Sequence, residues 1–231
     1  MTATIAPGIG IAESITRATL DLLSPFRPAE LPVDPDFATR RGERIAMELR
    51  FQRFDVEGVG ELRWTTLTSA RADIVALMLF PNEPQALPIF ASEFVVIAGR
   101  CKAAVVDFQS VATNAERRRL HSEPLRAIAP AYAAWRATEL PAWCADHFTP
   151  HAIAALAVDM DDIGALFQGY HRYLATYTRL AHATGPHPAR DTAELRHYKH
   201  HHITHTPGRP MMSAALGAQW TERFLVEGMY A

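Results

Sequence analysis

The sequence predicts an α+β protein in which one antiparallel sheet carries helices on both faces. Up to residue 110 the chain is rich in short apolar runs separated by turn residues, a pattern typical of strands. After residue 115 apolar residues recur at helical spacing. A block of strands followed by a block of helices favours an α+β fold. With 231 residues, 48% of them hydrophobic, the chain is long enough to bury a large core.

The N-terminal part supplies one helix and the first hairpin of the predicted sheet. Residues 11–23 have the apolar spacing of an amphipathic helix, and prolines then break it. Residues 25–38 are proline-rich and predict a connector across the surface. Arg44–Val56 and Glu61–Thr68 follow as two strands with alternating apolar and polar residues, joined by a glycine-containing turn.

The stretch from Asp73 to Ser110 organises the rest of the chain. It contains three apolar runs rich in Val, Ile and Phe, which predict strand, turn, strand, turn and strand. The first loop carries three prolines and an asparagine, so it cannot join the sheet, and the second is short enough for a hairpin. The runs are Ile74–Phe80, Ile89–Ile97 and Ala103–Phe108, and the loops are Pro81–Pro88 and Gly99–Lys102.

The clearest helix predicted from the sequence spans Asp159–Ala183. Three aspartates fill its first turn, where the helix dipole favours acids, and Gly185 with Pro186 ends it. Its aromatic stripe favours a packed core over a cofactor site. We expect one domain over residues 1–231, made of a helix and connector (1–38), a sheet (43–110) and a mainly helical part (115–231).

Composition excludes several classes of function. A net charge of −2 gives no basic field for nucleic acid and no attraction to a membrane surface. No apolar run approaches the ~20 residues of a membrane helix, and no signal peptide is evident. Two cysteines are too few for a disulfide scaffold and suit free thiols in a reducing compartment, so we expect a cytoplasmic protein.

Asp107 is the candidate catalytic residue that the strand pattern itself suggests. It ends the third apolar run, between Val106 and Phe108. Burial among apolar neighbours makes a carboxylate costly and raises its pKa, which suits a proton donor. The alternative interpretation is an aspartate that caps a turn at the end of a strand.

Three motifs resemble the ferredoxin-dependent bilin reductases. The first is FPxxxxxLPIFASEFV, followed by a hairpin and VVDFQ; the second is ELPAWCADHF (Glu139–Phe148); the third is HYKHHHITHTPGRPMMSAALGAQWTERFL. Their order and spacing carry the resemblance, which covers Glu43 to Leu225. It implies a three-layer α/β/α sandwich with a central antiparallel sheet, and a linear tetrapyrrole bound between the sheet and the C-terminal helices.

The resemblance also implies a reaction. The family reduces biliverdin IXα, or a dihydrobiliverdin, to a phytobilin by sequential electron and proton transfers through bilin radicals. Reduced ferredoxin, an iron–sulfur protein, supplies the electrons to a CH–CH group, and the enzyme binds no cofactor of its own. The absence of GxGxxG, GxxxxGK[ST] and GxSxG motifs agrees with this. The strand ending DFQ, in place of DLSP, resembles the phycoerythrobilin-forming branch of the family. We also expect the protein to be a monomer.

The same resemblance assigns roles to named residues. Asp107 would be the proton donor and His205 the second donor. Phycocyanobilin-forming members add a Glu and a His on the sheet, but Met78 stands at the position of that Glu and no His precedes His121. The expected substrate-binding residues pack on the tetrapyrrole, hold its propionates or line its pocket. They are Arg63, Met78, Phe90, Phe108, His197, His201, Thr206 and Arg209.

Two other classes of function stay open at this point. A non-catalytic bilin-binding protein would carry the pigment unchanged. A metalloenzyme would use His197, His201 and His205, which share one helix face at i, i+4 spacing. The simpler interpretation of this histidine run is a polar, partly exposed helix, and no Cys or carboxylate lies within it, so we expect no metal site.

Overall fold

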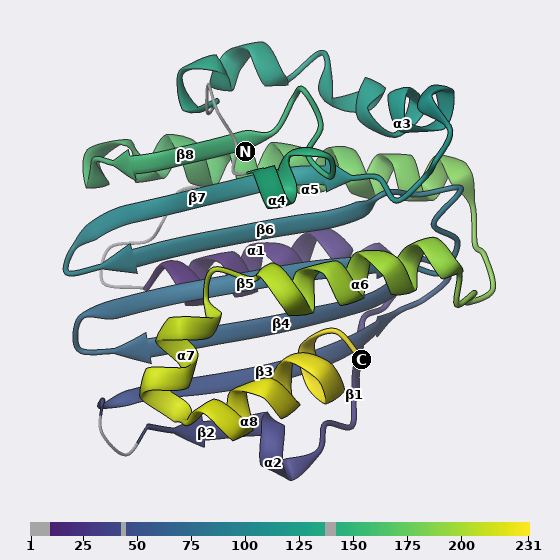
Figure 1. The fold of residues 1–231 in the computed structure, drawn as a ribbon. Coiled ribbons are helices and arrows are strands. Elements are labelled where there is room, and N and C mark those ends of the chain that lie inside the picture. The colour runs from purple at the N-terminus through teal and green to yellow at the C-terminus, as the bar shows by residue number, and fades with distance from the viewer. Residues whose placement is uncertain (1–9, 43–44, 137–141) are drawn as a thin grey trace.

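A computed structural model describes residues 10–42, 45–136 and 142–231. Its centre is an antiparallel sheet, which has eight strands within these residues in the order β1-β3-β4-β5-β6-β7-β8, with β2 also paired to β3 (Figure 1). The strands are β1 (Ala29–Leu31), β2 (Thr39–Arg41), β3 (Met47–Val56), β4 (Gly60–Ser69), β5 (Ala72–Pro81), β6 (Ile89–Ile97), β7 (Arg100–Gln109) and β8 (Ile153–Val158).

The predicted central strands are confirmed as β3 to β7, and the sheet is larger than predicted. The connector at 25–38 contains the short strand β1 and the helical turn α2 (Pro35–Ala38). β1 forms because the backbone of the connector pairs with the edge of β3. β8 extends the sheet beyond residue 110 by pairing with β7, which the short run IAALAV did not reveal. Arg44, the predicted start of the first hairpin, lies outside the described residues.

Helices cover both faces of the sheet, as Figure 1 shows, so the predicted three-layer α/β/α sandwich is confirmed. The helices α1 and α5 share one core with one face, and α6 to α8 share a second core with the other. The helices are α1 (Ile11–Leu23), α3 (Ala115–Ser122), α4 (Ala142–Ala145), α5 (Ile163–Thr184), α6 (Ala193–His205), α7 (Arg209–Leu216) and α8 (Ala218–Arg223). The described residues also form a π-helical turn (Phe224–Met229) and 3₁₀ turns at 24–26, 123–125, 129–135 and 160–162.

The face under α1 and α5 is a closed aromatic core. Tyr170, Tyr173 and Tyr177 of α5 are fully buried, and their rings meet those of Phe90 and Phe108 edge-on or tilted at 5.5 to 6.4 Å. The Tyr177 hydroxyl donates to the Pro88 carbonyl at 3.0 Å. Each fully buried aromatic side chain stabilises the fold by about 1.5–3 kcal/mol. The aromatic stripe is therefore core, as the sequence predicted.

None of the described helices combines the length and apolar character needed to cross a bilayer.

Candidate functional site

The face of the sheet opposite α1 and α5 holds a cavity of about 410 Å³, which lies between the central strands and the C-terminal helices. Small residues such as Ala76, Ala91 and Ala103 face it from β5, β6 and β7 and form part of its floor. Trp143 and Met212 are among the larger side chains that line it from the helical layer. A largely apolar cavity with a few polar groups is the usual form of a small-molecule site.

Asp107 lies on the cavity side of β7, between the lining residues Val105 and Gln109, but it does not itself line the cavity. Its side chain is fully buried and is covered by Thr149, whose backbone N–H and hydroxyl donate to the two carboxylate oxygens at 2.7 and 2.5 Å. Burial raises the pKa of Asp107 to about 7, although both Thr149 hydrogen bonds lower it. A carboxyl that titrates near neutrality can both hold and release a proton.

Glu93 of β6 is a second acid on this floor. It pairs with Ala76 on one side and Val105 on the other, and all three line the cavity. Burial raises its pKa. In the part of the chain that the structure describes, its carboxylate makes no hydrogen bond and no ion pair.

Tyr198, His202 and Tyr230 form an aromatic cluster near these acids, and of the three His202 and Tyr230 line the cavity. The Tyr198 hydroxyl donates to Gln109, and the His202 ring lies 4.2 Å from the Tyr198 ring. Tyr230 stacks on His202 at 5.7 Å. Burial and the neighbouring histidines lower the pKa of His202 to about 3, so its imidazole is neutral at physiological pH. Its buried Nε2 has no partner among the described residues.

His201 and His205 stand together at one edge of the cavity, over Trp143. Their rings stack at 4.3 Å, and Trp143 lies nearly parallel to both. Ring nitrogens of the two histidines meet the Trp143 and His201 carbonyls, respectively. Neither imidazole lines the cavity, and His197 is exposed. No group of three His, Cys, Asp or Glu side chains within the described ranges is arranged to hold a metal.

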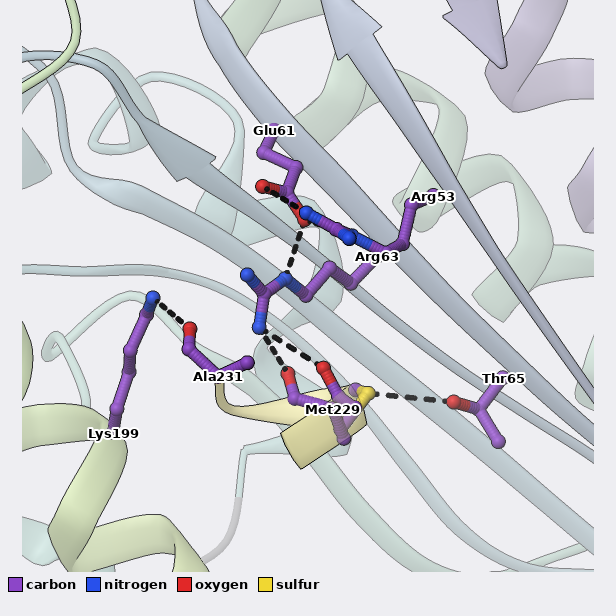
Figure 2. Close-up of polar contacts among 8 residues, drawn as sticks. Arg53, Glu61, Arg63, Thr65, Lys199, Met229 and Ala231 are labelled. Atoms are coloured by element: carbon purple, nitrogen blue, oxygen red, sulfur yellow. Dashed lines mark hydrogen bonds and ion pairs between the residues drawn. The ribbon is translucent and has the colours of Figure 1, made fainter. Parts of the chain in front are cut away.

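Arg63, an expected propionate partner, is used by the protein itself (Figure 2). Its guanidinium donates through Nε to Glu61 at 2.6 Å and through Nη1 to the carbonyls of Gly228 and Met229 at 3.1 Å. The side chain is buried and does not line the cavity. Its observed role is to fasten the segment Phe224–Ala231 to β4.

Two more cations surround this fastening. Arg53 also binds Glu61, at 2.6 and 3.0 Å, and Lys199 donates to the Ala231 carbonyl at 2.5 Å. Burial raises the pKa of Glu61, but the hydrogen bonds and charges of Arg53 and Arg63 outweigh it and lower the pKa to about 2. Burial lowers the pKa of Lys199 to about 8.

The structure corrects the sequence-based site at several positions. Phe90 and Phe108 face the closed aromatic core. Successive side chains of a strand point to opposite faces, so Phe108 points away from the side of the sheet that Asp107 occupies. The guanidinium of Arg209 meets Glu222 and the Ile203 carbonyl instead of the cavity. Two of the expected substrate-binding residues line the cavity: Met78 on its floor and Thr206 in the turn between α6 and α7.

Sequence reasoning missed four residues of the site: Thr149, Glu93, His202 and Tyr230. Only Glu93 left a signal in the sequence, because it is a lone acid within an apolar strand, like Asp107. The other three reach the site through the packing of distant segments, which no local pattern reports.

The fold and the cavity are those of a protein that holds a largely apolar molecule against a sheet beside buried acids. The sequence model of the ferredoxin-dependent bilin reductases matches residues 15–230, so the chain belongs to that family. It is a ferredoxin-dependent bilin oxidoreductase, in which ferredoxin is the electron donor and a bilin the substrate.

Two curated relatives are similar over most of their length. Phycocyanobilin:ferredoxin oxidoreductase of Trichodesmium erythraeum is 22% identical over 210 residues, which cover 89% of this chain and 85% of the relative. 15,16-Dihydrobiliverdin:ferredoxin oxidoreductase of Gloeobacter violaceus is 21% identical over 224 residues, covering 93% and 89%. The crystal structure of phytochromobilin synthase from tomato in complex with biliverdin shares the fold, with a TM-score of 0.81, 14% identity and coverage of 94% and 82%.

Proposed function

We propose that this protein reduces biliverdin IXα, or a dihydrobiliverdin, to a phytobilin, acting as a monomer with one domain over residues 1–231. The observation that carries the proposal is Asp107, a buried acid on the cavity face whose pKa is about 7. The two curated relatives differ in the bilin they are named for, and both use ferredoxin. The mostly apolar lining of the cavity supports a mostly apolar substrate with a few hydrogen-bonding groups.

In the proposed reaction, saturating one double bond of the bilin takes two electrons and two protons. Two reduced ferredoxins supply one electron each, and each becomes oxidised. The first electron makes a bilin radical anion, which is more basic than the bilin, so a nearby acid protonates it. Asp107 supplies such a proton and regains one from solvent. Met78 on the floor and Thr206 on the helical side would contact the substrate.

The pH dependence of turnover tests the role of Asp107. Only the protonated acid can donate, so we expect turnover to fall as pH rises through the Asp107 pKa of about 7. Thr149→Val removes a hydrogen bond that stabilises the charged carboxylate. That loss raises the Asp107 pKa and should move the alkaline limb to higher pH.

Thr149→Ser is the matched control, since it keeps the hydroxyl and should leave the alkaline limb in place. The measurement is the initial rate of bilin reduction across pH 6 to 9. A limb that stays unchanged in Thr149→Val would show that another group controls the rate.

The substrate assignment is tested by supplying biliverdin IXα and 15,16-dihydrobiliverdin separately with a ferredoxin reducing system. Chromatography of the extracted pigments should show a more reduced bilin from at least one of them. If both pigments bind and return unchanged, the protein is a bilin carrier and the proposal fails.

A further inference from the structure

Gln109, near the end of β7, is a polar side chain of the cavity that the reaction described above does not use. It lines the cavity and is only 3% exposed. Asp107 lies two residues earlier on the same strand. Residues at this spacing point to the same side of a sheet and lie about 6.5 Å apart along the strand. A molecule that contacts Gln109 therefore lies beside Asp107 as well.

Tyr198 of α6 fixes the direction in which the Gln109 amide faces. Its hydroxyl donates to Oε1 of Gln109. Burial raises the pKa of Tyr198 well above its usual value, so the hydroxyl keeps its proton and remains a donor. This hydroxyl has no other partner among the described residues. The amide oxygen is thereby occupied, and the NH₂ group of Gln109 is the part that remains free to donate.

The Tyr198 ring is itself held by three neighbouring rings. His202 lies 4.2 Å from it and His147 5.1 Å, while Phe80 meets it edge-on at 6.5 Å. A side chain that is fixed by packing on several sides can hold a binding group in one orientation. The Gln109 amide is therefore preorganised before any ligand enters the cavity.

The free NH₂ group of Gln109 defines the kind of ligand atom that it suits. No described residue accepts a hydrogen bond from it. A buried donor is costly unless a ligand or water accepts from it. It is neutral, so it matches a neutral acceptor better than a carboxylate, which prefers a cation. A linear tetrapyrrole has such acceptors in the carbonyl oxygens of its two terminal lactam rings, whereas its pyrrole N–H groups are donors.

We propose that Gln109 donates from its side-chain amide to the lactam carbonyl of a terminal ring of the bound bilin, with Tyr198 as its positioning residue. This inference rests on the proposed function. The contact sets the register of the bilin along β7, so that a terminal ring and its adjoining bridge lie beside Asp107. Reduction is thereby directed to that end of the bilin and away from the central bridge between the two middle rings.

Gln109→Met tests the contact, because methionine has a similar length, suits an apolar cavity and lacks the amide. We expect biliverdin to bind about tenfold more weakly. Resonance Raman spectra of the bound pigment should show a lactam carbonyl band at higher frequency than in the wild type, since its hydrogen bond is lost. Products reduced at other positions should rise about tenfold relative to the main product, as measured by chromatography of the extracted pigments.

Gln52→Met is the matched control, because Gln52 is an exposed amide of the same sheet that bonds only Glu30 among the described residues. Its carbonyl band, affinity and products should equal those of the wild type. If Gln109→Met does not fold, Tyr198→Phe provides the test, since it leaves the amide in place but unanchored. It should broaden the lactam band and increase the minor products. An unchanged band and product pattern in the variant that folds would overturn the assignment.

Failure of this inference can be told apart from failure of the proposed function. If the wild type reduces bilin and Gln109→Met gives the same carbonyl band and products, only the assignment of Gln109 fails. If the wild type binds biliverdin without reducing it, the proposed function fails, and the Raman comparison still tests the contact because it needs no turnover. A wild type that binds no bilin would overturn both.

Discussion

Replacing Asp107 by Asn is expected to slow bilin reduction by about 10² to 10⁴-fold while bilin binding is retained. Asn is nearly isosteric with Asp, so its amide can accept from the Thr149 N–H and donate to the Thr149 hydroxyl, which now bond the carboxylate. It cannot supply a carboxyl proton. Electrons still enter from ferredoxin, so a bilin radical should accumulate, which single-turnover absorbance and electron paramagnetic resonance would detect.

Thermal unfolding provides the structural control for this variant. The pKa of Asp107 is raised from 3.8 to about 7 in the folded state, so the neutral acid is favoured there. The stability linked to this shift is complete below pH 3.8 and is lost as pH rises to about 7. The Asn variant should therefore melt no lower than the wild type at pH 8.

Loss of pigment binding in the Asn variant would show that Asp107 is an anchoring residue. Turnover at the wild-type rate would contradict its assignment as a catalytic residue.

Replacing Arg63 by Met is expected to destabilise the protein by about 3 kcal/mol, the lower end of the range for breaking a buried ion pair. The change removes the charge between Glu61 and the carbonyls of Gly228 and Met229. Those carbonyls lose their donor, and the segment Phe224–Ala231, which helps to line the cavity, loses its fastening. The melting temperature should fall by about 10 °C, and bilin binding should weaken.

Arg53→Met is the matched control, since Arg53 bonds the same Glu61 but lies 31% exposed and makes no described contact with that segment. An exposed ion pair contributes about 1 kcal/mol or less to stability.

The pKa of Glu61 is about 2 instead of 4.5, so the stabilising contribution of the Glu61 carboxylate is present above pH 4.5 and is lost as pH falls toward 2. The deficit of Arg63→Met should shrink over that interval. Equal, small effects of the two substitutions would contradict the fastening role.

The strands of the sheet were predictable from sequence because burial on one or both faces leaves a local apolar pattern. The central strands from Met47 to Gln109 and the helix ending at Thr184 lie close to their predicted bounds. β1 and β2 have three residues each, too short for a pattern to develop. Their place is decided by pairing with β3, which is a property of the folded chain.

The site was less predictable because its residues converge from distant segments. Asp107 could be found because an acid in an apolar strand is unusual, and Glu93 carries the same signal. Phe108 shows the limit of reasoning from motif membership alone, since adjacent residues of a strand cannot both face the cavity. Arg63 has the chemistry of a propionate partner, but the carbonyls of Gly228 and Met229, which accept from its guanidinium, lie 165 and 166 residues away in sequence. Only the fold reveals that they occupy it.

Reduction of bound bilin by ferredoxin is tested most directly by an anaerobic absorbance measurement on the wild-type protein with biliverdin IXα, before and after reduced ferredoxin is added. We expect a bound-pigment spectrum that saturates at one biliverdin per chain. Reduced ferredoxin should then produce a transient radical band, followed by the shorter-wavelength spectrum of a phytobilin. A pigment spectrum that stays unchanged while ferredoxin remains reduced would contradict this expectation.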